Sequence, residues 1–242
     1  TSSGLLKDVK GLSSSEITDL LGNITTVVTN GKAVDQKDSV SVATTGGSVI
    51  ATGDVKVGST AINKLDMSAG SGGLGLVSAS IATDKAVLNN NVFTNISGTT
   101  LQGTNVKINA NLGGTKQGVT DYGKVLTGVG AAAGLNLSIP GAIAISNGSV
   151  ATNVNDATII ASKDIAIDSN DNSSIDAQVY GVSLGIINVS GAVSSADNNV
   201  KTTVTLGDEK TKNSIEATDA ITVTANRAGK VNAYTLAGNY GA

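Results

Sequence analysis

The sequence predicts an all-β fold in which short parallel strands stack into an elongated solenoid. Three features favour this fold: apolar residues make up 40% of the chain although aromatics make up only 2%, glycine occurs 30 times, and one motif recurs. Small and β-branched side chains suit closely stacked pleated surfaces better than they suit helices. Disorder is disfavoured because charged residues make up 14% of the chain and Val and Ile recur throughout it.

The first 45 residues are expected to be an irregular or capping segment that continues into the solenoid. Ser13 and Glu16, which precede Ile17, fit a capping box at the start of a short helix. An irregular coil fits the same residues, so both alternatives stay open. Residues 46–242 are expected to form the solenoid as a single elongated rod.

Four segments carry the recurring motif. It consists of an apolar residue, three small or polar residues, Asp or Asn, and then apolar-x-apolar. It occupies residues 50–57, 101–108, 160–167 and 215–223, the last with one extra residue. The starts are separated by 101 − 50 = 51, 160 − 101 = 59 and 215 − 160 = 55 residues, which indicates a repeat of about 55 residues.

Each motif predicts a corner followed by a strand. The apolar-x-apolar part indicates a short strand with one buried face. The preceding Asp or Asn is expected to form the corner, because these residues tolerate left-handed backbone geometry and hydrogen-bond their own backbone. The predicted structural corner residues are Asp54, Asn105, Asp164 and Asp219.

A second, uncharged unit lies between the motifs, at residues 73–81, 134–145 and 181–193, and an Asn-rich region follows each copy. Each repeat is therefore expected to hold about two to three coils of roughly 20 residues. At the usual strand spacing, about 12 such coils would form a rod on the order of 55–60 Å long. Stacked Asn side chains are expected to form ladders along this rod.

Three segments carry a family resemblance: AQVYGVSLGIINVSGAV at 177–193, KTTVTLGD at 201–208 and IEATDAITVTA at 215–225. They resemble the repeats of large type V-secreted bacterial exoproteins, which include filamentous haemagglutinin-like adhesins and the leukotoxin-type filamentous adhesins of fusobacteria. The resemblance extends over residues 45–242. It implies a right-handed parallel β-helix and a location that is secreted or on the outer-membrane surface of a Gram-negative bacterium.

The resemblance also implies a function. The chain is expected to be a segment of a virulence exoprotein that acts as an adhesive β-helical rod and contacts the host cell surface through an unidentified receptor. A segment of a secreted cytotoxin, or leukotoxin, that acts on host leukocytes is the alternative. Neighbouring β-helical repeats of the full-length protein are the implied partners within the rod. End-to-end self-association is expected where strand edges stay uncovered.

A carbohydrate-active β-helix enzyme is a third hypothesis, but no enzymatic activity is expected. Acid–base catalysis needs groups that titrate near the working pH, whereas the chain has no His and a single Arg, Arg227. The Asp and Asn residues recur with the repeat, which indicates corners and not one active site. No catalytic residue and no cofactor are therefore predicted.

Nucleic acid and metal ions are not expected as partners. The chain has 16 basic and 19 acidic residues and no basic stripe with stacking aromatics. Residues 168–173 begin like a calcium-binding EF-hand loop, but Ser173 replaces the required Gly and Val179 replaces the bidentate Glu. A solvated loop leaving the rod is predicted for this segment.

Long uncharged runs cover residues 67–83, 125–155 and 177–196, and the second contains a GxxxG sequence at 130–134. A membrane-inserting hairpin is one interpretation. Because the runs recur with the repeat, they are predicted to form the rod interior, so that membrane contact is allowed but not required.

The tyrosines are the large amphipathic candidates for an exposed partner-binding surface. Packing within the rod or at its end is the alternative. These residues are Tyr122, Tyr180, Tyr234 and Tyr240.

Overall fold

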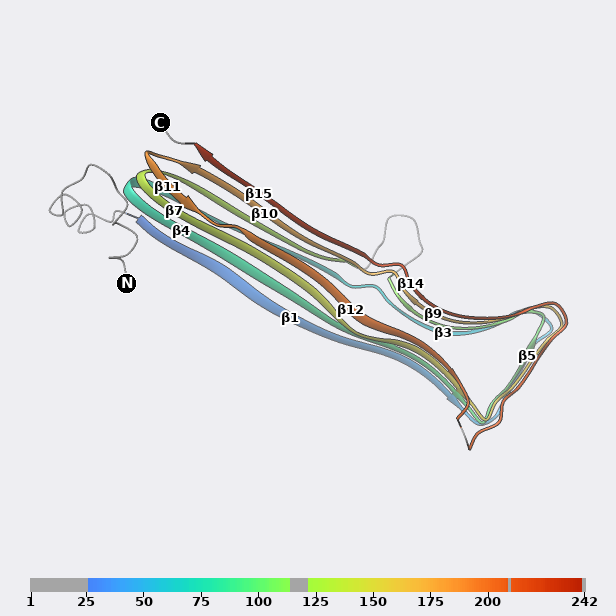
Figure 1. The fold of residues 1–242 in the computed structure, drawn as a ribbon. Helices are drawn as coiled ribbons and strands as arrows, with labels where there is room; N and C mark the ends of the chain where they lie inside the picture. The colour runs from blue at the N-terminus through green and yellow to red at the C-terminus, as the bar shows by residue number, and fades with distance from the viewer. Residues whose placement is uncertain (1–25, 114–121, 209, 241–242) are drawn as a thin grey trace.

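The structure is a computed structural model that describes residues 26–113, 122–208 and 210–240. Within these ranges the chain forms fifteen strands and no helix, and the strands pair in parallel (Figure 1). The predicted all-β class is therefore confirmed. The helix considered after Ser13 lies outside the described residues.

The strands form three sheets. Sheet A has the order β1 (Thr26–Thr45), β4 (Lys64–Ser97), β7 (Tyr122–Asn155), β10 (Ser174–Leu184) and β15 (Lys230–Tyr240), and β11 (Ile187–Ser190) and β12 (Val193–Leu206) also pair with β7. Sheet B contains β2 (Ser48–Ile50), β5 (Thr100–Gly103), β8 (Thr158–Ala161) and β13 (Ser214–Ala217). Sheet C contains β3 (Val55–Ala61), β6 (Val106–Leu112), β9 (Ile165–Asp171) and β14 (Ile221–Arg227).

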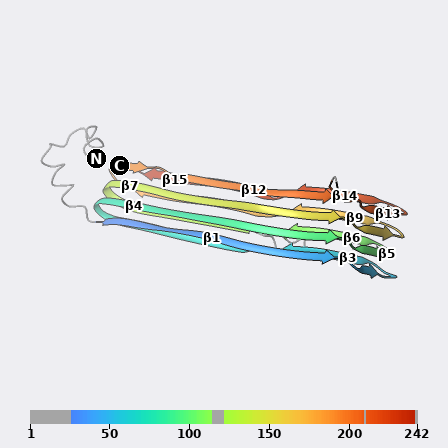
Figure 2. The same cartoon turned by 90° about the horizontal axis from the view of Figure 1, so that it is seen from below.

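The chain returns to the same sheet after one full repeat. Val55 pairs with Val106 (106 − 55 = 51) and Val106 pairs with Ile165 (165 − 106 = 59). We call one passage through the three sheets a circuit. Sheets B and C are each four-stranded, so the described residues form four circuits, which lie side by side in Figure 2. The expected coils of roughly 20 residues are therefore wrong, because one circuit uses the whole repeat.

The circuits are large because β4 and β7 each continue for 34 residues and double back on themselves (Figure 1). Their alternation of apolar and small residues is not interrupted by a corner, and Gly75, with φ of 157°, lies where β4 reverses. Each circuit is thus a long, flat loop. We call the end where β4 and β7 reverse the turn end. Sheet B closes the opposite end.

The core lies between the long sides of the flat circuits. Its largest fully buried side chains gather toward sheets B and C, where Leu101, Ile108 and Ile159 belong to one cluster. A second cluster lies farther along the long sides and contains Leu88 and Ile175 together with several alanines. Large apolar side chains therefore stabilise the half of the molecule that is far from the turn end.

Residues 26–45 are strand, which differs from the irregular or capping segment expected for residues 1–45. β1 pairs with residues 78–97 of β4 over its whole length. The boundary drawn at residue 45 therefore does not separate two kinds of structure. The physical reason is that the period-2 alternation of β1 matches that of β4, so its backbone groups complete the same parallel ladder.

Asparagine ladders cross the circuits, as the sequence predicted. On one long side Asn199 Nδ2 donates to Asn147 Oδ1 at 3.3 Å, and Asn147 Nδ2 donates to Asn89 Oδ1 at 3.2 Å. Asn89 Nδ2 then donates to Asp35 Oδ1, so this ladder reaches all four circuits. Separate rungs join Asn153 to Asn95 at 2.8 Å and Asn170 to Asn111 at 3.1 Å.

Candidate functional site: the apolar end

Exposed apolar side chains gather at the turn end. Leu74, Leu76 and Ile186 are 75%, 65% and 74% exposed, which is unusual for side chains of this size. We call the following set the apolar end: Leu74, Leu76, Val182, Leu184, Ile186, Leu236 and Tyr240. These residues come from β4, β10, β15 and the turn after β10, so separate circuits build one surface.

Strand register aligns these residues in rows across the circuits. Leu74 and Leu184 both pair with Ala132, and Leu184 also pairs with Tyr240. Side chains of paired residues in a parallel sheet lie on the same face. The row therefore continues across β4, β7, β10 and β15 at the turn end. Each of these strands contributes one apolar or aromatic side chain to it.

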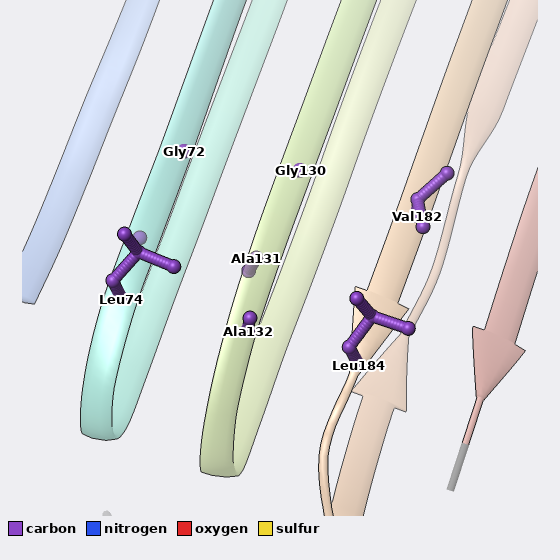
Figure 3. Close-up of a pocket in the computed structure, with 8 residues that line it drawn as sticks. Gly72, Leu74, Gly130, Ala131, Ala132, Val182 and Leu184 are labelled. Atoms are coloured by element: carbon purple, nitrogen blue, oxygen red, sulfur yellow. The ribbon is translucent and has the colours of Figure 1, made fainter.

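Glycine residues form the base of the surface beside this row. Gly72, Gly130 and Val182 form the next row, and a Cβ at Gly130 would meet no atom within 4 Å. The open space shows that packing does not require glycine at position 130. A shallow depression of about 500 Å³ results, and Figure 3 shows it lined by Leu74, Ala132, Val182 and Leu184.

Tyrosines border the apolar end. Tyr180 and Tyr234 are exposed on the same outer face, with ring centroids 5.8 Å apart and ring planes inclined at 50°. The Tyr180 hydroxyl donates to Gln178 Oε1 at 3.3 Å. Each ring thus presents an apolar face and a polar rim. The structure therefore places three of the four tyrosines at the surface, while nothing is described of the Tyr122 side chain.

Behind this surface the interior is polar. Ser78 Oγ donates to Asn136 Oδ1 at 3.1 Å, Asn136 Nδ2 donates to Ser183 Oγ, and Ser183 Oγ donates to Asn188 Oδ1 at 3.0 Å. The Ser80 hydroxyl is also buried there. The usual distribution is therefore reversed at the turn end, where small polar side chains point inward and large apolar ones point outward.

Among residues 26–113, 122–208 and 210–240, the charged side chains lie away from the turn end. Residues 67–83, 125–155, 177–196 and 231–240 contain none. On the outer face of β4, β7 and β10 the nearest charged side chains are Asp66, Lys124 and Asp176, which share one row. The prediction that the uncharged runs form the rod interior holds for alternate residues of these runs, and the other residues face outward.

The predicted corner residues lie where sheet B gives way to sheet C. Asn105 Nδ2 donates to Asp54 Oδ1 at 2.8 Å, and the Asp164 amide donates to Asn105 Oδ1 at 3.4 Å. Asp219 does not continue this stack. Its amide donates to the carbonyl of Lys163, and Ala220 occupies the place of Asp164. The strand register causes this shift: sheets B and C are both offset by 56 residues between the third and fourth circuits (215 − 159 and 221 − 165), which places Asp219 opposite Lys163.

Left-handed backbone occurs at a different corner, between sheets A and B. Gly46, Gly98 and Gly207 have positive φ there, and Asp156, with φ of 51°, is the one described non-glycine residue with this geometry. Asp54, Asn105, Asp164 and Asp219 lie at a corner between sheets B and C, but none of them uses the left-handed geometry that Asp and Asn tolerate. Asp54, Asn105 and Asp164 stack through side chains and a backbone amide, and none of the four residues reverses the chain by a positive φ.

The calcium-loop-like segment is buried and is not the solvated loop expected for it. Asp171 is fully buried, and its Oδ1 accepts hydrogen bonds from the Ser173 amide and hydroxyl at 2.9 and 2.6 Å. Asn198 Nδ2 donates to Oδ2 at 3.2 Å, and Arg227 Nε lies 3.7 Å from the same oxygen. Within the described ranges no group of three or more potential metal ligands occurs.

One exposed carboxylate has a shifted pKa. The backbone amide of Lys210 and the hydroxyl of Thr211 donate to Asp208, which holds its pKa below the ordinary value of 3.8. This turn connects β12 to β13 at the sheet B end. It therefore organises a loop that lies far from the apolar end.

The apolar end was not identified as a surface from the sequence. Its signal is present in the uncharged runs at 67–83, 125–155 and 177–196, but the side on which each residue lies depends on the register.

No described helix is long and apolar enough to cross a bilayer. Comparisons of the chain with protein-family models, curated proteins and solved structures found no match.

Proposed function

We propose that the chain is a segment of a right-handed parallel β-helix in a large secreted or surface-exposed exoprotein of a Gram-negative bacterium, and that it serves as an adhesive rod contacting host cells. Parallel pairing between residues 51 to 59 positions apart supports the β-helix. The resemblance of residues 177–193 to repeats of type V-secreted adhesins supports the exported, adhesive role. Neighbouring repeats would extend the rod at its open ends.

The apolar end is the observation that carries this proposal. Soluble proteins rarely expose contiguous apolar patches unless the patch is an interaction site. Here Leu74, Leu184 and Tyr240 belong to one row built by several circuits, so the scaffold presents them at fixed spacing. A row on a flat face favours surface contact over catalysis. The buried carboxylates Asp84 and Asp171 point into the interior, away from any such contact.

A cytotoxin segment acting on host leukocytes is the second candidate. The absence of charge from residues 125–155, which form most of β7, is the observation that favours it. A surface without charge meets apolar material with no desolvation penalty for ionic groups. Both candidates involve contact with a host cell, and they differ in whether the cell membrane stays intact.

Flow cytometry on leukocytes and epithelial cells tests the proposal. The chain contains no Cys, so Ser162→Cys at the exposed corner between sheets B and C gives one labelling site far from the apolar end. Saturable binding without entry of a viability dye is the expected result. Dye entry at the same protein concentrations would favour the cytotoxin. Absence of binding to every cell type would contradict both candidates.

A further inference from the structure

We propose that the apolar end inserts shallowly into the phospholipid membrane of the contacted cell. This inference rests on the proposed function, because it uses the same surface and names the chemical class of its partner. Its starting point is the reversed polarity of the turn end. Ser78, Asn136 and Ser183 hydrogen-bond inside, while Leu76 and Ile186 are exposed outside.

The hydrogen-bonded interior removes the need for an apolar core at the turn end. Hydrogen bonds link Ser78, Asn136, Ser183 and Asn188 across the circuits, so the chain closes there without large inward side chains. The buried hydroxyls of Ser71, Ser80 and Ser138 have no hydrogen-bond partner among the described residues. The leucines and isoleucines of the turn are thus not required inside. Their outward position is best explained by an apolar environment outside, since burial of each such side chain is favourable.

Charge complementarity favours lipid as that environment. Residues 125–132 follow Lys124 toward the turn, and this uncharged stretch extends for roughly 26 Å at the rise of a strand. Protein partners usually bring a polar, partly charged rim to an interface. Over this length the apolar end offers no charged group that could pair with such a rim, whereas hydrocarbon chains require none.

The boundary of the surface also matches a membrane interface. Tyr180 and Tyr234 lie between the apolar end and the row formed by Asp66, Lys124 and Asp176. Tyrosine favours the zone between hydrocarbon and water because its ring is apolar and its hydroxyl is polar. In this orientation the tyrosines would lie nearer the headgroups than the charged row, which would stay in water, and the turn would lie deeper.

The strand edges limit the depth of insertion. The unpaired backbone groups of an open sheet edge are costly in hydrocarbon, which excludes a spanning position for the described circuits. A shallow insertion of about 5–10 Å places the turn side chains in the acyl boundary and leaves the edges in water or among headgroups. Leu76 and Ile186 in the turn would then enter first.

Flotation with vesicles of phosphatidylcholine alone tests the inference. We expect the full chain to float with these uncharged vesicles. The chain lacks Trp, so brominated phosphatidylcholine should quench its tyrosine emission directly. The double variant Leu76→Asp/Ile186→Asp is expected to lower partitioning by at least about tenfold, since two apolar side chains no longer enter lipid.

Ile50→Asp is the matched control. Ile50 is 68% exposed, close to the 65% of Leu76, but it lies in sheet B at the opposite end of the circuit. It should leave vesicle binding unchanged. Equal loss in both variants, or no flotation of the unmodified chain, would overturn the inference. Binding to cells but not to vesicles would also overturn it, while leaving the proposed adhesive function in place with a protein or glycan partner.

Discussion

At the scale of the residue, the corner between sheets A and B depends on left-handed backbone. Gly46, Gly98 and Asp156 follow the last paired residues of β1, β4 and β7, respectively, and each has a positive φ. A side chain at such a position costs roughly 1–2 kcal/mol unless the residue is Gly or a tolerant Asn or Asp. The corner is therefore built by backbone geometry repeated from circuit to circuit.

We expect Gly98→Ala to destabilise the protein by roughly 1–2 kcal/mol. The cost is conformational, because a Cβ there would lie 3.8 Å from the nearest atom, the Gly46 nitrogen. Asp156→Gly should stabilise by up to about 1 kcal/mol for the same reason. Gly128→Ala, where a Cβ meets no atom within 4 Å, is the control and should be neutral or slightly stabilising. Denaturant midpoints that are equal for Gly98→Ala and Gly128→Ala would contradict this account.

At the scale of the element, the sequence predicted strands, the repeat and the Asn ladders, but it placed the register one residue away in two motifs. Leu101 pairs with Val49 and Ile159, whereas the motif had aligned it with Ile50 and Ile160. A shift of one residue exchanges the two faces of a strand. Val49 and Ile50 are both apolar, and so are Ile159 and Ile160, so the motif fits equally well with either residue of each pair aligned to Leu101. Only the stacked neighbours decide which of them is buried.

The same ambiguity hid the apolar end. In the run at 181–193, Val182, Leu184 and Ile186 alternate with Ser183 and Gly185, and either set suits the interior by size or by hydropathy. The sequence favours the apolar set, but the hydrogen bonds of Ser183 and Asn188 hold the polar set inside. Such a network exists only once several circuits lie together, so no single segment predicts it.

The Asn ladder is expected to couple neighbouring circuits. Asn147 bonds to Asn89 and Asn199, so Asn147→Ala removes two hydrogen bonds between strands. We expect a loss of about 1–2 kcal/mol, because partly exposed hydrogen bonds contribute little each. Asn91→Ala is the control, since Asn91 points to the same side of β4 but forms no side-chain hydrogen bond in the described part of the chain. Equal denaturant midpoints for the two variants would show that the ladder adds no stability.

At the scale of the whole molecule, the stack is open at the fourth circuit. Ile221, Val223 and Val231 occupy the inward rows of Ile165, Ile167 and Ile175. Ile221, Val223 and Val231 are 49%, 45% and 46% exposed. The residues they pair with one circuit earlier are 1%, 0% and 1% exposed. The fourth circuit therefore exposes side chains at positions that belong to the buried core in the circuit before it. A further circuit would cover it, as each circuit covers the one before.

The isolated chain is therefore expected to associate end to end. Its open face differs from the face at β1, so the contact is heterologous and can extend into oligomers without closing. Sedimentation should show a weight-average mass that rises with concentration. Ile221→Lys/Val223→Lys should suppress the rise, because charges at an uncovered edge oppose strand addition. Leu76→Asp/Ile186→Asp should leave it intact if the open core drives association. The reverse pattern would show that the apolar end contacts a second copy, and a monomer at all concentrations would show that the end circuits are protected.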